Sequence, residues 1–213
     1  MITAASNSRI KRLVQLNQKS KLRRTEDVFL AEGVKMFLEA PREQLQEVYV
    51  SESFLEKCSC REHLEEVGYE VVSDSVFSKI SDTCTPQGVL CVLKQFHYNI
   101  EEMLRDKAPL FLLLENIQDP GNLGTMLRTG EGAGVSGIIM SRDTVDLYNP
   151  KVIRSTMGSI YRVPFYYADD FAAAVHQVQR AGVSVYAAHL RGKNSYACQD
   201  YTKGTCLLYT SDA

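Results

Sequence analysis

The sequence predicts an α/β protein with two successive domains. Short apolar runs of strand length alternate with helical segments along the 213 residues. A polar stretch that ends at Pro109 interrupts the alternation, which restarts with the apolar run 110–114. In the second half the strand-like runs are continuously apolar, as is typical of a parallel sheet covered on both faces. We therefore expect a small N-terminal α/β domain followed by a mainly parallel-sheet α/β domain.

Hydrophobic periodicity and capping residues predict the individual elements. Residues 6–24 predict one helix, capped by Ser6 or Asn7, because apolar side chains recur at helical spacing. Further helices are expected over 34–40, 53–68, 74–81 with an Asp74 cap, 121–134, part of 149–164, and 169–182. Strands are expected over 28–33, 45–51, 69–73, part of 85–96, 110–116, 135–141, 163–168 and 183–190. The chain is accordingly divided into a basic helical arm (1–24), a small domain (25–97), a linker (98–108) and a larger domain (109–213).

Composition excludes several classes of protein. No apolar run approaches the roughly 18 residues of a membrane span. The basic, polar N-terminus has no signal-peptide core, so we expect a cytoplasmic protein without a membrane partner. The six cysteines lack the spacing of a zinc site, and we expect reduced, mostly buried thiols and no metal.

Positive charge is concentrated at the N-terminus. Residues 1–24 carry seven Lys or Arg and no Asp or Glu, and the rest of the chain carries −9, since the whole carries −2. A basic arm on an acidic body can bind phosphate groups. A solvated helix face is the alternative interpretation.

The stretch Gly132–Gly137 matches G-x-G-x-x-G literally. A dinucleotide-binding fingerprint joins a strand to the start of a helix. Here the glycines follow a predicted helix and lead into a strand, so they predict a helix stop and a tight connection. A nucleotide-dependent oxidoreductase is disfavoured for this reason.

The front of that helix carries more information. It follows the carboxyl end of the strand 110–116, where open α/β sheets place ligands. Asn122 is expected to cap the helix after a turn at Pro120–Gly121. Arg128 stands further along among apolar and small residues. Its side chain either extends past the sheet edge or contacts a phosphate or oxyanion, and the residues alone leave both open.

Residues 119–140, DPGNLGTMLRTGEGAGVSGIIM, resemble the first motif of the SpoU-type (TrmH-like) RNA 2′-O-ribose methyltransferases, which belong to the knotted SPOUT superfamily. Residues 149–165 are similar to the segment that follows in that family. Residues 2–40 and 69–93 are similar to its N-terminal lead and small substrate-binding domain. The resemblance extends to about residue 205.

This resemblance implies a SPOUT-type methyltransferase domain after the substrate-binding domain. It also implies methyl transfer from S-adenosylmethionine to a ribose 2′-hydroxyl of structured ribosomal or transfer RNA, by a homodimer. Asn122 matches the motif asparagine, and Arg128 matches the arginine credited with activating the hydroxyl. Because a guanidinium is effectively always protonated, we expect Arg128 to stabilise the developing alkoxide or fix the adjacent phosphate. A non-catalytic RNA-binding module is the alternative function.

Binding residues follow from the resemblance and from the charge pattern. The expected cofactor wall consists of Ala188, His189, Leu190 and Gly192. The expected RNA-binding residues are Arg9, Lys11, Arg12, Lys21, Arg23, Arg24, Arg154 and Ser155. The family assigns no general-base role to His189, and no G-x-S-x-G elbow surrounds Ser155 to make it a nucleophile.

The sequence departs from the family at its C-terminal end. Residues 201–213 begin the expected strand, but the family's G-x-E-x-x-G-like turn and Ser-Leu-Asn stretch do not follow. In the family these motifs build the knot, most of the cofactor pocket and much of the dimer interface. The final TSDA matches nothing in the motif. We therefore expect this chain, as a C-terminally truncated member, to bind S-adenosylmethionine poorly and to be inactive.

Overall fold

The computed structural model describes residues 1–105, 107–189 and 191–210, which form two compact units. The first unit combines residues 1–95 with 146–161, and the second combines 96–145 with the residues from 162 on. By its contacts, segment 146–161 is thus part of the same unit as the N-terminal residues. No helix in the described residues is long and apolar enough to cross a membrane. The four-part division drawn from the sequence stays a prediction.

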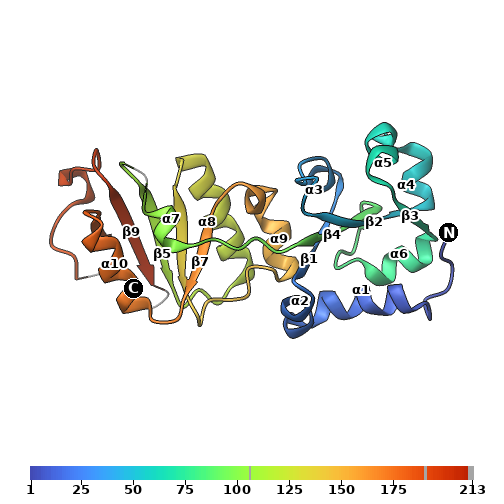
Figure 1. Cartoon of the computed structure of the whole chain (residues 1–213), viewed down its shortest axis with the longest axis horizontal. Coiled ribbons are helices and arrows are strands. Elements are labelled where there is room, and N and C mark those ends of the chain that lie inside the picture. Colours follow the sequence, from blue (N-terminus) through green and yellow to red (C-terminus); the bar gives the residue numbers. More distant parts are fainter. Residues whose placement is uncertain (106, 190, 211–213) are drawn as a thin grey trace. The chain divides into compact units, whose positions relative to one another are not determined.

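The first unit is built on a four-stranded mixed sheet in the order β1-β4-β2-β3 (Figure 1). Strand β4 is antiparallel to β1 and β2, and β2 is parallel to β3. The strands are β1 Val28–Glu32, β2 Leu45–Ser51, β3 Glu70–Val72 and β4 Val89–Lys94. The helices are α1 Ser8–Gln18, α2 Ser20–Glu26, α3 Val34–Leu38, α4 Glu52–Lys57, α5 Arg61–Val67, α6 Asp74–Ile80 and α9 Pro150–Thr156, with a 3-10 turn η1 at Ser159–Tyr161.

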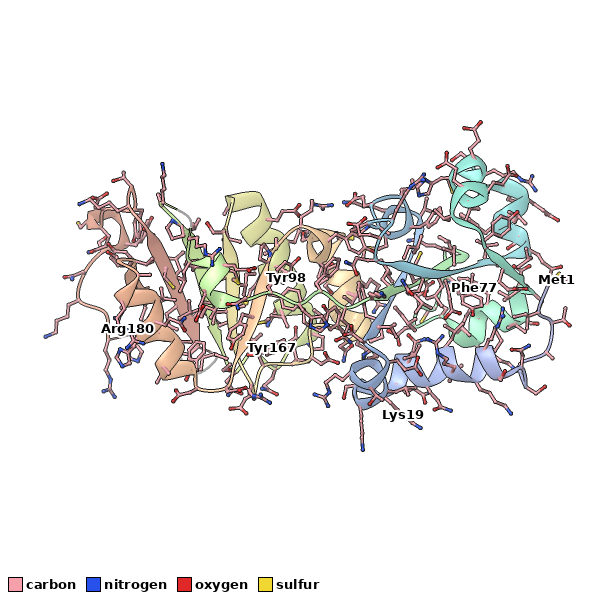
Figure 2. The ribbon with its side chains drawn as sticks, viewed as in Figure 1. Met1, Lys19, Phe77, Tyr98, Tyr167 and Arg180 are labelled. Carbon is pink, nitrogen blue, oxygen red and sulfur yellow. The ribbon has the colours of Figure 1, made fainter. Side chains whose placement is uncertain are left out.

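The N-terminal helix is part of the core of this unit. Ile10, Leu13 and Leu16 lie on one face of α1 and are fully buried, and α1 lies beside α6 (Figure 1). Phe77 of α6 occupies the same cluster (Figure 2). The apolar face of α1 is therefore part of the core of this unit.

Two predicted details of this unit are wrong. The expected single helix over 6–24 is two, because Lys19 is extended and Arg23 supplies the hydrogen bonds that the carbonyl groups of the last turn of α1 need. Asn7 caps α1, as one of the two predicted caps. Ser73, not Asp74, is the N-cap of α6, because the Asp74 carboxylate accepts hydrogen bonds from Ser53 instead.

The second unit contains a five-stranded sheet in which every pairing is parallel, in the order β7-β6-β5-β9-β8. The predicted mainly parallel sheet is confirmed. The strands are β5 Leu110–Glu115, β6 Gly137–Ser141, β7 Phe165–Ala168, β8 Ser184–Ala187 and β9 Thr205–Thr210. The helices are α7 Ile100–Met103, α8 Pro120–Ala133 and α10 Phe171–Arg180, with a 3-10 turn η2 at Tyr196–Cys198.

Two helices share a core with this sheet. Ile100 and Met103 of α7 and Ala174 and Val178 of α10 are buried in one cluster with the central strand residue Phe111. The glycine-rich stretch closes α8, because Gly134 adopts a left-handed conformation at φ 74° and its N–H bonds the last carbonyl groups. The predicted helix stop is confirmed, so these glycines are not at a helix start where they would cradle a dinucleotide.

Candidate functional site

Helix α8 begins at the carboxyl end of β5, which is the edge of a parallel sheet that presents ligand-binding residues. Its N-cap is Asp119, whose carboxylate accepts the Asn122 N–H at 2.7 Å, and Pro120 occupies the first helical position. The prediction that Asn122 caps the helix is therefore wrong. Proline at the first position needs no N–H partner there, which places the cap one residue before it.

Two hydroxyl groups brace the loop that precedes α8. The Asn116 N–H donates to Ser141 Oγ at 2.9 Å, and the Ile117 N–H donates to Thr144 Oγ1 at 3.3 Å. Both hydroxyl-bearing residues are nearly buried, with 6% and 5% of their surface exposed. Asn116 itself has φ 55°, a left-handed conformation that asparagine tolerates better than most residues other than glycine. The loop is thus held in one shape by the end of the neighbouring strand β6.

The two residues expected to carry chemistry, Asn122 and Arg128, are both exposed on α8. They are separated by about 9 Å along the helix axis and by about 120° around it. Leu123 and Leu127 bury the opposite side of the helix. The Arg128 guanidinium pairs with no carboxylate among the described residues, so its charge remains available to a ligand.

A cavity of about 650 Å³ lies at the carboxyl ends of β5, β6, β7 and β9, within the size range of ligand pockets. Its lining is mainly polar and includes Glu115, Asn116, Asp143 and Asp170. The Arg142 side chain at its edge is paired with Asp169. Of the residues predicted to form the cofactor wall, the described Ala188, His189 and Gly192 do not line this cavity. Among the described residues, no cluster of three or more His, Cys, Asp or Glu side chains could hold a metal ion.

The predicted cofactor wall is an exposed turn after β8. The Arg191 N–H donates to His189 Nδ1 at 3.0 Å, and the Gly192 N–H donates to the His189 carbonyl at 2.8 Å. Nδ1 therefore acts as an acceptor in this arrangement, and Nε2 is the ring nitrogen that can donate. Ala188 and Gly192 are exposed as well, whereas Leu190 lies outside the described residues.

The basic residues of the first 24 positions separate into two groups. Arg9 pairs with Glu70, and Arg12 pairs with both Glu26 and Glu47 at 2.7 Å. Lys11, Lys21 and Arg24 are exposed and pair with no carboxylate in the described part of the chain. The predicted RNA contact thus reduces to a few exposed cations on a folded surface.

Arg23 is the exception among these basic residues. It is 2% exposed and donates to Asp146 Oδ2 at 2.6 Å and to the Leu16 carbonyl at 2.6 Å. Its buried Nε has no partner among the described atoms. The prediction that Arg23 binds RNA is wrong in this fold, because its guanidinium holds segment 146–161 against the core.

Arg154 and Ser155 are on α9 in the first unit. The Arg154 guanidinium donates to the Asp82 carbonyl at 3.2 Å and lies 3.5 Å from its carboxylate, yet the side chain is 47% exposed. The Ser155 hydroxyl donates to the Lys151 carbonyl one turn back, which leaves Ser155 without an activating base. Asn149, which precedes Pro150, caps α9.

Some residues of the site escaped the sequence analysis. Asp119 could have been found, because an acidic residue before proline is a common start of a helix. Ser141 and Thr144 could not, since their backbone partners lie more than 20 positions away in the chain.

The similarity of the chain to known proteins is extensive. The 23S rRNA (guanosine(2553)-2′-O)-methyltransferase RlmP of Bacillus subtilis is 31% identical over 198 residues, which cover 92% of this chain and 75% of that protein. The chain belongs to the SpoU rRNA methylase family. The model of the SpoU rRNA Methylase family matches residues 109–209, and the model of the MRM3-like substrate binding domain matches residues 7–91. The human mitochondrial rRNA methyltransferase 3 is 41% identical over 88 residues, or 39% of this chain.

Solved structures of SpoU-type proteins have the same fold. An rRNA methyltransferase from Sinorhizobium meliloti matches 100% of this chain and 82% of its own, with a TM-score of 0.85 and 28% identity. A second structure of an rRNA methyltransferase from that organism, with S-adenosylmethionine bound, matches with a TM-score of 0.81 and 27% identity. S-adenosylmethionine is thus the cofactor of this family, and the expected SPOUT-type fold is confirmed.

Proposed function

We propose that the chain transfers a methyl group from S-adenosylmethionine to a ribose 2′-hydroxyl of ribosomal RNA. The observation that carries the proposal is the combination of the SpoU family match with an unpaired, exposed Arg128 on the helix that follows β5. A methyl donor, a hydroxyl acceptor and a fixed cation are the groups that this reaction needs.

In this proposal Arg128 stabilises negative charge and does not accept a proton as a base. Its guanidinium stays protonated, so it stabilises the oxyanion that forms as the hydroxyl loses its proton, or holds the adjacent phosphate. Donors placed where charge develops contribute about 10²- to 10³-fold in rate. Since Asp119 supplies the helix cap, the Asn122 amide is available to orient the nucleotide or the guanidinium.

The cofactor fits the predicted wall in chemical terms. Ala188 and Gly192 are exposed positions with little or no side chain, and His189 Nε2 can donate to an acceptor nitrogen. Bound there, S-adenosylmethionine supplies the electrophilic methyl group. The turn then orients the cofactor, while the chemistry depends on holding hydroxyl and methyl in line.

We further propose that the active form is a cytoplasmic homodimer acting on ribosomal in preference to transfer RNA. Support for the RNA class comes from the name of RlmP, and support for the compartment comes from six free cysteines. The dimer is proposed because Asn122 and Arg128 face solvent on a helix whose opposite side is buried.

Methylation of 23S rRNA fragments with tritium-labelled S-adenosylmethionine tests the proposal. The proposal predicts that label is incorporated; the expectation from the sequence that this chain is inactive stays a prediction, which the same assay tests. Arg128→Ala should lower kcat at least 100-fold while RNA affinity changes less than twofold. Arg180→Ala is the matched control, because Arg180 is an exposed arginine on α10 of the same unit (Figure 2).

The alternative is a non-catalytic RNA-binding module. It predicts RNA binding without label incorporation and no difference between Arg128→Ala and Arg180→Ala. Incorporation of label that survives Arg128→Ala would contradict the assigned role of Arg128 and leave the methyltransferase proposal standing.

A further inference from the structure

A second cavity lies in the first unit, apart from the residues assigned to methyl transfer. Its volume is about 230 Å³, and we call it the α3–α9 pocket. The start of α3, the loop 81–88 and the end of α9 enclose it. The lining residues that matter here are Gly33, Met36, Thr83, Gln87, Arg154 and Met157.

The pocket is preformed because its loop is tied to the sheet. The Glu32 carboxylate accepts the Ser81 hydroxyl at 2.9 and 2.8 Å and the Thr83 hydroxyl at 3.2 Å. Gln87 Oε1 accepts the Val34 N–H at 3.1 Å. Gly33 has φ 114°, a backbone conformation that L side chains rarely adopt, so glycine is needed at this turn beside Gln87.

The pocket has an apolar side that solvent reaches. Met36 is 5% exposed and forms part of its lining, whereas Met157 is 44% exposed. Met157 also adopts φ 53°, a left-handed conformation that is unfavourable for its side chain. Met157 ends α9 in this conformation, with its N–H bonded to the Arg154 carbonyl, so the backbone serves as the helix cap. Its exposed thioether offers a ligand a flexible apolar surface.

Cations stand at the rim of the same pocket. Arg154 and Lys35 both line it. Arg154 lies 3.5 Å from the exposed Asp82 carboxylate and also donates to the Asp82 carbonyl, and Lys35 lies 3.7 Å from the half-buried Glu39 carboxylate. Pairs of exposed cations such as these contribute little stability. Both cations can therefore exchange these partners for a phosphate at low cost. The Glu32 carboxylate also lines the pocket, and its oxygens accept hydrogen bonds from Ser81 and Thr83.

We propose that the α3–α9 pocket receives one unpaired nucleobase of the RNA substrate. The base stacks against the Met157 thioether, its edge meets the polar groups of Thr83 and Gln87, and the flanking phosphates meet Arg154 and Lys35. The inference rests on the proposed function only in taking RNA as the ligand. The volume is below the roughly 300–1,000 Å³ of pockets for larger ligands, which fits a single heterocycle.

The chemistry favours RNA over a peptide. Sequence-specific RNA recognition targets unstacked bases, which need a flat or flexible apolar contact, hydrogen-bonding groups at the edge and cations for the backbone. The pocket has all three within one small volume. An extended peptide would need a longer groove or a free strand edge.

Fluorescence anisotropy with two RNA hairpins tests the proposal. One hairpin carries a single-nucleotide bulge with 2-aminopurine, and the other is fully paired and of equal length. The protein should bind the bulged hairpin about tenfold more tightly, as expected for one stacked base. Met157→Asn should remove this preference without weakening binding to the paired hairpin, because asparagine tolerates the left-handed conformation. Arg154→Gln should weaken binding to the bulged hairpin more than to the paired one.

Two controls match these variants in the same unit. Leu38→Asn changes another exposed apolar residue, and Arg61→Gln removes another exposed, ion-paired arginine. Both should keep the preference for the bulge. Equal binding of the two hairpins by the unaltered protein, or a preference that survives Met157→Asn, would overturn the inference. rRNA methylation without a preference for the bulge would overturn only the pocket. A Met157-dependent preference without methylation would overturn only the proposed function.

Discussion

The two units hold their functional segments in different ways. The first unit fixes segment 146–161 with a charge pair between the buried Arg23 and the partly exposed Asp146. The second unit fixes the loop before α8 with neutral hydrogen bonds that its N–H groups donate to Ser141 and Thr144, and with the Asp119 cap. Removing the partner of a buried charge costs several kcal/mol of stability, whereas breaking a neutral hydrogen bond costs less.

This difference suits the proposed tasks of the units. The first unit faces a polyanion in our proposal, and its exposed cations are paired only loosely with surface carboxylates. The second unit presents Arg128, which pairs with no carboxylate among the described residues, on a helix capped by the Asp119 carboxylate.

The largest effect is expected from breaking the charge pair of the buried Arg23. Asp146→Ala leaves Arg23 buried without its counterion and should lower the free energy of unfolding of the first unit by about 3 kcal/mol. Urea titration followed by circular dichroism measures it. Arg42→Ala, which breaks an exposed pair with Glu66, should cost less than about 1 kcal/mol. Equal losses would mean that the Arg23 pair does not hold the segment.

A smaller loss is expected from the neutral brace of the second unit. Ser141→Ala leaves the Asn116 N–H without its 2.9 Å acceptor and should lower the free energy of unfolding by about 2 kcal/mol. Ser78→Ala is the control, since that hydroxyl only bonds a carbonyl one turn back in α6. If the two variants unfold at the same urea concentration, the loop is held by other contacts.

The helix cap gives a still smaller effect and separates structure from chemistry. Asp119→Ala should cost about 1 kcal/mol of stability, because the Asn122 N–H loses its acceptor. Asn122→Ala should leave stability within about 0.5 kcal/mol and lower methylation instead. Thermal unfolding and label incorporation measured on both variants decide it. If Asn122→Ala lowered stability and Asp119→Ala did not, Asn122 would be the residue that stabilises the start of the helix.

Charge on the surface of the first unit affects binding more than stability. Replacing Lys11, Lys21 and Arg24 together by glutamine should reduce the slope of log K against log salt for RNA binding by about 2. Anisotropy titrations across a salt series provide the slope. These substitutions avoid the buried face of α1, which deletion of residues 1–24 would remove. An unchanged slope would mean that α1 and α2 carry only a solvated face.

Cysteine labelling compares how readily the two units open, since each unit has one deeply buried thiol on a strand. Its effects are the smallest expected here. Burial raises the pKa of Cys206 in β9 to about 12 and raises the pKa of Cys91 in β4 further. Exposed Cys84 and Cys198 should react at once at pH 8, and the buried pair only after opening. The stability due to the raised pKa is present below about pH 8.5 and is lost as the pH rises toward 12.

The variants extend this measurement. Ser141→Ala should speed labelling of Cys206 and leave Cys91 unchanged, and Asp146→Ala should do the reverse. Equal acceleration of both thiols by either variant would mean that the two units unfold together.

The sequence predicted the type of nearly every element because apolar periodicity is a local property. The parallel sheet and the helix stop at Gly134 follow from runs of a few residues. The break at Lys19 and the burial of Arg23 do not, because both depend on an Asp146 that lies more than 100 positions away. Ser141 and Thr144 could not be predicted either, because their partners are also distant in the chain. Asn122 was misjudged as a cap because Pro120 was interpreted as a turn residue and not as the first residue of α8.

The discontinuity of the first unit has a consequence for synthesis. Its residues 146–161 follow β5, α8 and β6 of the second unit in the chain. A nascent polypeptide therefore cannot complete its N-terminal unit when residue 95 leaves the ribosome. Arg23 waits without its counterion until Asp146 has been translated, and by then half of the second unit has emerged. The order of translation thus obliges the two halves to mature together, and a partly made chain carries an exposed core edge that chaperones are suited to shield.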